Sequence, residues 1–390
     1  MTAGGYDKKM RYSRRIEDML SDTRDKMIID IRSEEDFMKG SYPGAMNFPE
    51  DKFDSHITDL RKDIPIYLIC YSGKRSLEIC SELDPRGYEI YSIHGGIHGC
   101  YLHFNKERSR DPEAAALRRR NIERSIIKTY RSELWSRFTR AIKNYELIKD
   151  GDRIAVCISG GKDSMLMAKL FQELERHGKK NFEAVYLVMD PGYNSINLET
   201  IMSNAALMQV PVQVFESRIF DVVDAAADSP CYLCARMRRG ALYSRARELN
   251  CNKIALGHHY DDVIETILMG MLYGGQIQGM MPKLHSTNFE GMELIRPLYL
   301  IRENDIKRWR DHNKLNFINC ACRLTESCSS CGGTEKGSKR AEIKALIRDL
   351  KEKNPYIEAN IFKSVENVHL GTVTGYKTPD GEKHSFLDTY

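Results

Sequence analysis

One short stretch, residues 153–164, restricts the fold of this chain more than any other part of it. Its first six residues, Arg-Ile-Ala-Val-Cys-Ile, are rich in Ile and Val, as is typical of a buried strand in a parallel sheet. The string Ser159-Gly160-Gly161-Lys162-Asp163-Ser164 follows, and the mostly apolar residues 165–170 open a helix. Such a Gly-rich turn directs backbone N–H groups at an anion, while the helix N-terminus and Lys162 add positive charge. The stretch therefore predicts an α/β domain with a phosphate-binding turn.

This turn differs from the common P-loop, because Val156 and Asp163 occupy the places of its first Gly and of its Ser or Thr. The six residues from Ser159 to Ser164 resemble instead the pyrophosphate loop (PP-loop) of ATP pyrophosphatases. The resemblance implies a doubly wound parallel sheet whose loop binds ATP, splits it between the α- and β-phosphates and adenylates a substrate. The alternative is a turn that merely joins a strand to a helix.

Length and composition indicate how many domains the chain has and in which compartment it works. With 390 residues, 42% of them hydrophobic, it is long enough for two or three domains. It has no run of 18 apolar residues and begins with a polar, charged segment. We therefore expect no membrane helix, no signal peptide and a cytoplasmic location. The 11 Cys residues then favour metal or sulfur chemistry over a disulfide framework.

Residues 11–105 are expected to form a small α/β domain with a reactive thiol. The predicted strands 27–31 and 66–69 are short and apolar, and the second ends at Cys70. The loop after Cys70 contains Gly73, Lys74 and Arg75 and leads into a helix over 77–83. Backbone N–H groups that converge on the sulfur, with two cationic side chains beside it, favour a thiolate.

This first domain resembles a rhodanese domain. The resemblance rests on Asp30-x-Arg32, Gly44-Ala45-x-Asn47, the Cys70-x-x-Gly73-x-Arg75-Ser76 loop and His94-Gly95-Gly96-Ile97. It implies that Cys70 carries a persulfide, stabilised by Gly73, Lys74 and Arg75. The alternative is a degenerate rhodanese domain that serves only for docking. Cys80 and Cys100 are expected to be ordinary thiols.

Residues 106–150 are expected to form a basic helical linker. Ile126, Tyr130, Leu134, Phe138 and Ile142 recur every fourth residue and define one apolar helix face. Residues 107–149 contain 12 Lys or Arg and 6 Asp or Glu, so this segment holds the cationic surplus of a chain whose net charge is only +4. Such a helix favours contact with an RNA backbone. A solvated charged face is the alternative.

Residues 151–370 are expected to form the second domain, with residues 371–390 as a tail. Strands are predicted over 184–189, 210–215 and 253–256. The last of these ends in a polar segment whose Gly257, His258, Asp261 and Asp262 suit ATP phosphates and Mg²⁺. The alternative is a helix start capped by Asp261.

Two groups of Cys residues frame this second domain. Cys231 and Cys234 have the spacing of a metal-binding pair and precede Arg236, Arg238 and Arg239. A later cluster contains Cys320, Cys322, Cys328 and Cys331.

Residues 122–368 resemble the tRNA 2-thiocytidine synthetase family. The resemblance rests on the loop at 159–164, the Cys-x-Leu-Cys-x-Arg-x-Arg-Arg-Gly-x-Leu-Tyr block at 231–243, the Leu-Gly-His-His-x-Asp-Asp block at 256–262, and Arg296-Pro297-Leu298. It implies a [4Fe–4S] cluster held by three Cys residues, ATP-dependent adenylation of a cytidine in a tRNA anticodon loop, and displacement of AMP by sulfur. It also allows a homodimer.

The resemblance makes Cys231 and Cys234 two of the cluster ligands. For the third ligand, the position after Phe317 favours Cys320 or Cys322. The family's Cys-x-x-Cys-Gly motif, in contrast, matches Cys328 and Cys331. We expect the Cys320/Cys322 pair. A four-thiolate zinc site is the alternative, although the long separation is unlike a compact zinc ribbon.

Together these features predict a sulfurtransferase. Cys70 would take sulfur from a cysteine desulfurase or another sulfane donor and pass it to the cluster, and an ATP-activated tRNA base would receive it. Lys162 would offset phosphate charge, and Asp163 would orient Mg²⁺ or the base. The alternatives are a PP-loop enzyme acting on another base or a small molecule, and a sulfide or redox sensor that only binds ATP.

Overall fold

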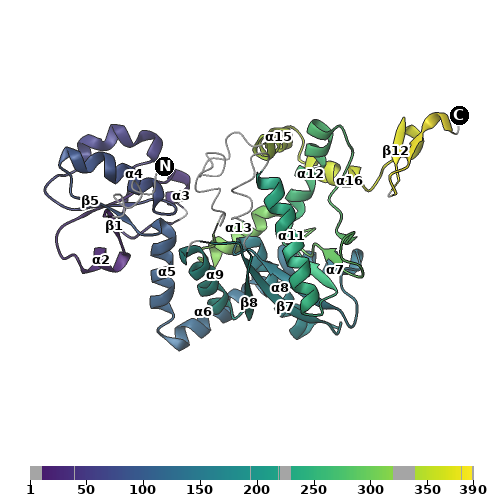
Figure 1. Cartoon of the computed structure of the whole chain (residues 1–390), viewed down its shortest axis with the longest axis horizontal. Helices are drawn as coiled ribbons and strands as arrows, with labels where there is room; N and C mark the ends of the chain where they lie inside the picture. The colour runs from purple at the N-terminus through teal and green to yellow at the C-terminus, as the bar shows by residue number, and fades with distance from the viewer. Residues whose placement is uncertain are drawn as a thin grey trace.

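The computed structural model describes residues 11–38, 40–193, 195–217, 219, 230–318, 339–378 and 380–388, with the backbone alone for 230–235. Two α/β domains lie side by side, and a small C-terminal hairpin projects from the far end of the second (Figure 1). Its strands β12 (Gly375–Lys377) and β13 (Lys383–Ser385) pair antiparallel. In the described parts of the chain, no helix has the length and apolar character needed to cross a membrane.

The first domain is built on a parallel sheet. Its order is β1 (Ser13–Arg14), β5 (Ile90–Ile93), β4 (Ile66–Ile69), β2 (Met27–Asp30) and β3 (Met46–Asn47). The covering helices are α2 (Ile16–Ser21), α3 (Glu34–Met38), α4 (Lys74–Leu83) and α5 (Gly96–Arg108), with a 3₁₀ segment over Glu50–Asp59. Because β4 is central, all four of its residues are buried. Cys70 follows directly at the carboxyl edge of the sheet.

The second domain is built on a larger sheet. Its order is β10 (Lys283–His285), β11 (Glu293–Ile295), β9 (Lys253–Ala255), β6 (Arg153–Ile158), β7 (Glu183–Asp190) and β8 (Val212–Glu216). All neighbouring pairs are parallel except β10 with β11. The predicted doubly wound parallel sheet is therefore confirmed, with one antiparallel strand at its edge. The strand predicted over 210–215 begins two residues later.

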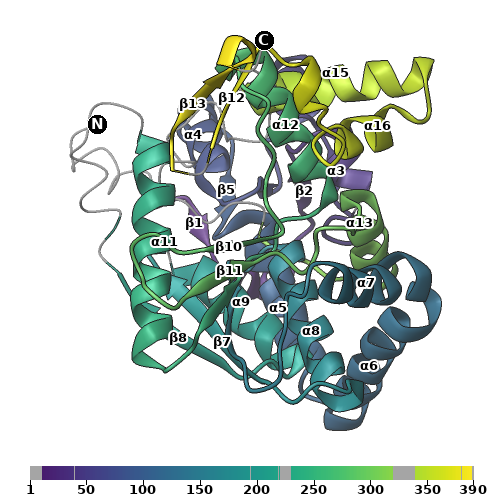
Figure 2. The same ribbon diagram turned by 90° about the vertical axis from the view of Figure 1, so that its right-hand side faces the viewer.

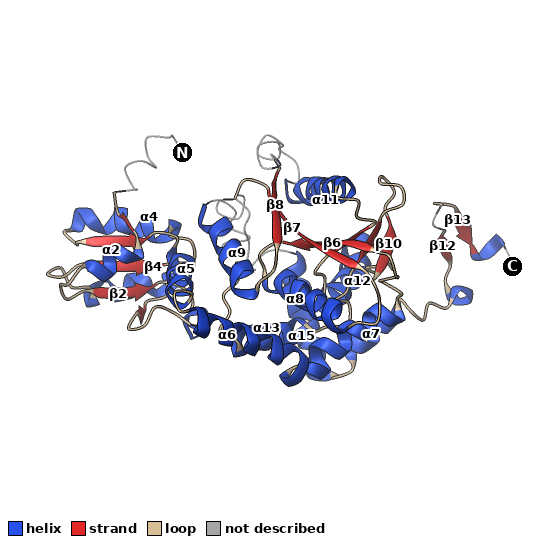
Figure 3. Cartoon of the chain, turned by 90° about the horizontal axis from the view of Figure 1, so that it is seen from below, coloured by secondary structure: helices blue, strands red, loops and turns tan. Residues whose placement is uncertain are grey.

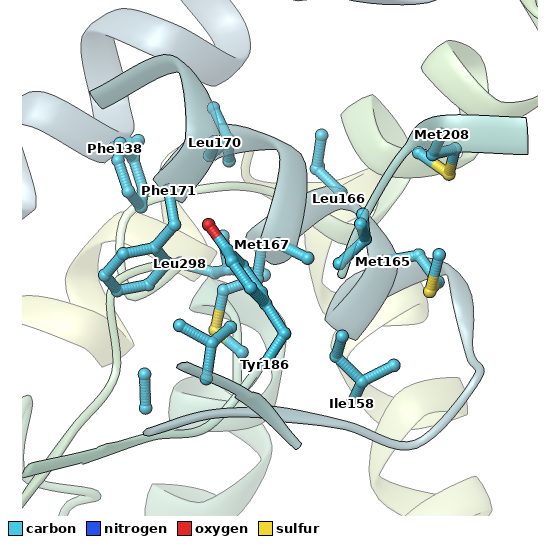
Figure 4. Close-up of a cluster of buried hydrophobic side chains, with 14 of the residues drawn as sticks. Phe138, Ile158, Met165, Leu166, Met167, Leu170, Phe171, Tyr186, Met208 and Leu298 are labelled. Atoms are coloured by element: carbon cyan, nitrogen blue, oxygen red, sulfur yellow. The ribbon is translucent and has the colours of Figure 1, made fainter. Parts of the chain in front are cut away.

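Helices cover both faces of this sheet. They are α8 (Lys162–His177), α9 (Ser195–Met208), α11 (Pro230–Glu248), α12 (Tyr260–Gly274), α13 (Glu303–His312), α15 (Lys339–Lys353) and α16 (Ile357–Ser364). Alternate residues of β6 enter the two cores: Ile154 and Val156 pack with α8, whereas Ala155 and Cys157 face the side of α11. This two-sided burial explains the uninterrupted apolar run of β6. Figure 4 shows α8 residues such as Met167 and Phe171 in the first core, and Figure 2 shows α15 and α16 beside α12.

The basic join packs into the second domain. It consists of α6 (Pro112–Arg124), two π-helical segments (Ser125–Thr129 and Arg131–Trp135) and α7 (Ser136–Asn144). The apolar face predicted from the four-residue period is confirmed, because all five of its residues are buried in the core around α8. The Trp309 Nε1–H of α13 also donates a hydrogen bond to Ser125 Oγ (3.0 Å).

The two domains meet through α5 and α9, which lie between the two sheets in Figure 3. Gly95 precedes α5 with φ +74°, and a Cβ at this position would collide with Ile196 of α9. Lys106 of α5 forms an ion pair with Glu199 of α9 (3.3 Å). The first domain therefore contacts the second with the segment that carries its Gly95-Gly96 turn.

Candidate functional site

The PP-loop turn lies at the carboxyl edge of the second sheet, between β6 and α8. Gly160 has φ +83°, and a Cβ there would collide with the side chains of Ile201 and Ile318. Ser164 Oγ braces the turn: it accepts a hydrogen bond from Ser159 N–H (3.2 Å) and donates one to Gly161 O (3.0 Å). Helix α8 begins at Lys162, so its N-terminal N–H groups lie at the turn, as an anion site requires.

Lys162 lies between two carboxylates. Its Nζ is 3.0 Å from Asp163 Oδ2 and 3.1 Å from Glu303 Oε1. Burial alone would lower the pKa of Lys162, but Asp163 and Glu303 raise it above its ordinary value. Burial likewise opposes ionisation of Glu303, yet Lys162, Lys307 and Lys344 lower its pKa to about 2. The pair is therefore charged over the whole physiological pH range.

The segment after β9 approaches the same turn. A Cβ on Gly257 would lie 3.2 Å from Ser164 N, which is tighter than an ordinary van der Waals contact, so glycine favours this close approach of the two backbones. His258 is largely buried, its Nδ1 has no hydrogen-bond partner, and burial together with the positive charge of Arg296 lowers its pKa to about 4. The predicted ATP-binding residues Gly257 and His258 thus lie beside the PP-loop turn.

The start of α12 corrects one alternative from the sequence. His259, not Asp261, is the N-cap: its ring nitrogen accepts from Asp262 N–H (3.4 Å), and Asp262 accepts from His259 N–H (3.0 Å). Asp261 instead accepts from Arg302 Nη2 (3.0 Å) and from Glu303 N–H (2.6 Å). A carboxylate at that place holds the start of α13 rather than the start of its own helix.

Three residues that sequence reasoning missed complete this cluster. Glu303 and Arg302 come from the start of α13, and Arg340 of α15 lies 3.2 Å from Asp262 Oδ1. Each follows the turn by more than 130 positions in the sequence. The one signal in the sequence was the Arg302-Glu303 pair, which directly follows the apolar residues 298–301, and it is a weak one.

A small cavity of about 60 Å³ opens beside the turn, lined by Gly161, Lys162, Asp163, Arg310, Phe317 and Ile318. The second carboxylate oxygen of Asp163, Oδ1, is buried and has no hydrogen-bond partner. Such an oxygen suits a cation or an N–H donor on a bound molecule. Within the described ranges, no three His, Cys, Asp or Glu side chains are grouped to hold a metal on their own. A magnesium ion here would take most of its ligands from phosphates and water.

The loop after β4 surrounds the thiol of Cys70 in the first domain. Cys70 is buried, its sulfur accepts from Gly73 N–H (3.1 Å), and Ser76 Oγ lies 3.2 Å away. Gly73 has φ +85°, which a side chain would disfavour. Ile97 N–H donates to Cys70 O (2.8 Å), so the Gly95-Gly96 turn is bonded directly to the Cys70 residue. This geometry stabilises negative charge on a sulfur atom.

Arg75 is held by two carboxylates of the first domain. Its guanidinium forms ion pairs with Glu50 (2.7 Å) and Glu78 (2.8 Å). Its positive charge is thus shared with these carboxylates, and its predicted role beside a persulfide stays a prediction. Two other rhodanese-like elements have structural roles. Asp30 forms a buried ion pair with Arg32, and the Asn47 side-chain amide donates to the backbone carbonyls of Asp30 and Arg32.

The other thiols of the first domain are core residues, as predicted. Cys80 and Cys100 are fully buried, and burial raises the pKa of Cys100 to about 12. Because burial disfavours the thiolate, we expect neither to react at neutral pH.

The predicted cluster ligands lie outside the described side chains. The backbone places Cys231 and Cys234 in the first turn of α11, and Cys320, Cys322, Cys328 and Cys331 are not among the described residues. Further along α11, Arg238 donates to Tyr193 OH (3.0 Å), which ties the Cys-Arg block to the loop after β7. The ligand set therefore stays a prediction.

Comparison with known proteins agrees with this architecture. Residues 14–102 match the family model of the rhodanese-like domain, and residues 131–323 match that of the PP-loop domain. A tRNA-cytidine(32) 2-sulfurtransferase of Alkalilimnicola ehrlichii is 34% identical over 62% of this chain and 75% of its own length. The protein of the same name from Geotalea daltonii is 35% identical over 60% of this chain and 90% of its own length.

Among solved structures, the U34-tRNA thiolase NcsA of Methanococcus maripaludis, determined with its [4Fe-4S] cluster, is 21% identical. It aligns with a TM-score of 0.47 over 59% of this chain and 76% of that one. The Alkalilimnicola ehrlichii protein, 34% identical and matched over 75% of its length, shows the family. A rhodanese-like domain precedes a PP-loop sulfurtransferase domain in this chain, which belongs to the tRNA-cytidine(32) 2-sulfurtransferase family.

Proposed function

We propose that this protein is an ATP-dependent tRNA sulfurtransferase that forms 2-thiocytidine in the anticodon loop and receives the sulfur through its own rhodanese-like domain. The observation that carries the proposal is the position of α9. Ile196 of this helix contacts Gly95 beside the Cys70 loop, and Ile201 contacts Gly160 of the PP-loop turn. These two residues are about 7.5 Å apart along the helix axis. The sulfur carrier and the ATP site thus share one short structural element.

The PP-loop turn would bind the phosphates of ATP. Backbone N–H groups of residues 159–164 and the Lys162 ammonium would oppose the charge that develops when pyrophosphate leaves. The cytosine carbonyl oxygen would attack the α-phosphorus, forming an O–P bond as the bond to pyrophosphate breaks. Asp163, whose Oδ1 has no hydrogen-bond partner, would orient Mg²⁺ or the base.

Cys70 would carry the incoming sulfur as a persulfide, held by the Gly73 N–H, after transfer from a cysteine desulfurase or another sulfane donor. A thiol reductant would supply the two electrons that convert sulfane sulfur to sulfide. Cys231, Cys234 and one of Cys320 or Cys322 would hold a [4Fe–4S] cluster, which when bound offers an open iron for that sulfur. Sulfide would then form the C–S bond and release AMP.

The test uses the intact protein, purified without oxygen, with tRNA, ATP, Mg²⁺, thiosulfate and a thiol reductant that supplies the two electrons. We expect AMP, pyrophosphate and 2-thiocytidine in equal amounts, measured by chromatography and by mass spectrometry of digested tRNA. Lys162→Met should lower AMP formation at least about 100-fold, because it removes a charge that stabilises the transition state. Lys179→Met is the matched control, since Lys179 is exposed.

Other outcomes separate the rival functions. If another thiolated nucleoside forms, the target is a base other than cytidine. If ATP binds but is not cleaved, the sensor function is favoured over the enzyme. An absorption spectrum without iron–sulfur bands, together with bound zinc, would replace the cluster by a zinc site. Cys70→Ala should slow thiolation at limiting thiosulfate, whereas Cys80→Ala should not; equal rates would reduce the first domain to a docking module.

A further inference from the structure

A second site lies at the join of the two domains, away from the PP-loop turn. It is a cleft of about 550 Å³ whose lining contains four cations, named here the cationic cleft: Arg108 at the end of α5, Arg118 and Arg124 of α6, and Lys314 after α13. The remaining lining residues are neutral or His, with no carboxylate among them. Both domains thus contribute to a single positive surface.

Among the described residues, the four cations have no carboxylate partners. No Asp or Glu oxygen of this part of the chain lies within 4.0 Å of any of them, although neighbours on the same elements are paired. Arg110 binds Glu107 at 3.0 Å, for example. Arg118 finds only neutral acceptors, Lys314 O at 3.2 Å and Asn105 Oδ1 at 3.5 Å. Burial and the nearby charge of Arg108 lower its pKa, so an anion in the cleft would relieve a repulsion already present.

The size and lining of the cleft select the kind of anion. Its volume lies in the range of sites for organic ligands, about 300–1,000 Å³, and is far too large for one inorganic phosphate. The exposed side chains of Asn121 and Thr129 add neutral hydrogen-bonding groups. Cations interleaved with amide and hydroxyl groups are the usual partners of phosphate and sugar oxygens.

The place of the cleft also fits a polynucleotide. Helix α13 is about 15 Å long. Its first residue, Glu303, contacts Lys162, whereas His312 and Lys314 at its other end line the cleft. Arg310, Phe317 and Ile318, from the same stretch, line the small cavity at the PP-loop turn. A strand whose phosphates lie in the cleft can therefore reach the ATP site.

We propose that the cationic cleft binds consecutive phosphates of the RNA substrate and so positions the target base at the PP-loop turn. This inference rests on the proposed function. It assigns RNA binding to a defined set of residues at the domain junction, in place of the join as a whole.

The test compares two triple variants of the full chain with equal loss of charge. Arg108→Gln, Arg118→Gln and Lys314→Gln remove the cleft cations. Arg119→Gln, Arg120→Gln and Lys128→Gln remove three cations of the same join that do not line the cleft. Binding of unmodified tRNA is measured by fluorescence anisotropy over a series of salt concentrations, and binding of tripolyphosphate is measured by isothermal titration calorimetry. Binding of ATP verifies that each variant is folded.

The cleft variant should bind tRNA roughly tenfold or more weakly and lose about two units of the slope of log affinity against log salt, whereas the control should stay within about twofold of the parent. Equal losses in the two variants, or none in either, would overturn the proposal and leave the proposed function intact. Loss of tripolyphosphate binding with tRNA binding unchanged would also overturn it, because the ligand would then be a free polyphosphate. A parent protein that binds ATP but no tRNA would refute both.

Discussion

The Lys162 ammonium meets two carboxylates before any phosphate arrives. Asp163 and Glu303 satisfy it at 3.0 and 3.1 Å, and Glu303 is held in turn by Lys307 at 3.2 Å. A phosphate bound at the turn would therefore share Lys162 with Glu303. The residues of the site form a charge network in which each described charge already has a partner of opposite sign.

Glu265 gives a prediction about pH. It is 3% exposed, and burial raises its pKa to about 7 from the usual 4.5. Between pH 4.5 and 7 the folded protein keeps a proton on Glu265 that the unfolded chain has lost. The contribution of Glu265 to the free energy of unfolding is therefore complete below pH 4.5 and is lost as the pH rises through 7. Glu265→Gln, which stays neutral, should therefore be more stable than the parent at pH 8, by up to about 3 kcal/mol, and nearly equal to it at pH 4.5.

Urea unfolding from pH 5 to 8 measures this difference. The matched control is Glu352→Gln, because Glu352 is exposed at the end of α15. A gap between parent and Glu265→Gln that stays the same at every pH would show that Glu265 is already ionised in the folded protein.

Residues within one local motif could be predicted from the sequence, and residues from remote segments could not. Ser159–Ser164 and the Cys70 loop each follow a strand and open a helix, so their neighbours in sequence define their surroundings. Glu303 and Arg340 reach the turn only because α13 and α15 pack there. The role of Arg75 depended on Glu50, which lies 25 positions earlier, and nothing local revealed that pair.

At the level of elements, α9 connects the two loops. It contacts Gly95 with Ile196 and Gly160 with Ile201, while Asn204 Nδ2 donates to Asn316 O (2.9 Å). We expect Ile196→Ala to loosen the contact with the Cys70 loop without changing either loop itself. Sulfur transfer from thiosulfate to cyanide and ATP cleavage should stay within about twofold of the parent, and tRNA thiolation should fall several-fold.

Met202→Ala is the control for this variant, since Met202 lies on the same helix and is 39% exposed. All three rates are measured on the same preparations. Thiolation by Ile196→Ala at the parental rate would mean that the contact between α5 and α9 has no part in sulfur delivery.

Among the elements, the strands and the apolar face of the join were predictable. Burial on both faces gives a strand an uninterrupted apolar run, and burial on one face gives a helix an apolar period of nearly four residues. The π-helical segments over 125–135 were not, since they preserve the same buried face while changing the backbone hydrogen bonds. The N-cap at His259 was not predicted either. Asp261 is the better capping residue by type, but its carboxylate accepts a hydrogen bond from Glu303 N–H at the start of α13.

For the whole molecule, the contact between the domains predicts transfer within one chain. An equal mixture of Cys70→Ala and Lys162→Met chains contains every active group, yet no single chain has both. If sulfur passes only between the domains of one chain, the mixture should thiolate tRNA at a small fraction of the parental rate, with limiting thiosulfate as donor. Thiolation is followed by mass spectrometry over a range of protein concentrations.

Recovery of the parental rate on mixing, most of all at low concentration, would show that the chains exchange sulfur, as a homodimer with crossed domains would do. Cys80→Ala mixed with Lys179→Met is the control, because neither change touches a proposed active group.

The join between the domains has one further consequence. Its inward side chains are committed to the core around α8, and Asp111 caps α6 by accepting from Glu113 and Ala114 N–H at 2.9 and 3.1 Å. The boundary between the two domains therefore lies in the short turn before Asp111, which belongs to the core of neither domain. A recombination event at that turn could exchange the front module for another sulfur carrier and leave the catalytic scaffold whole, so long as the newcomer offered a glycine-sized surface to Ile196.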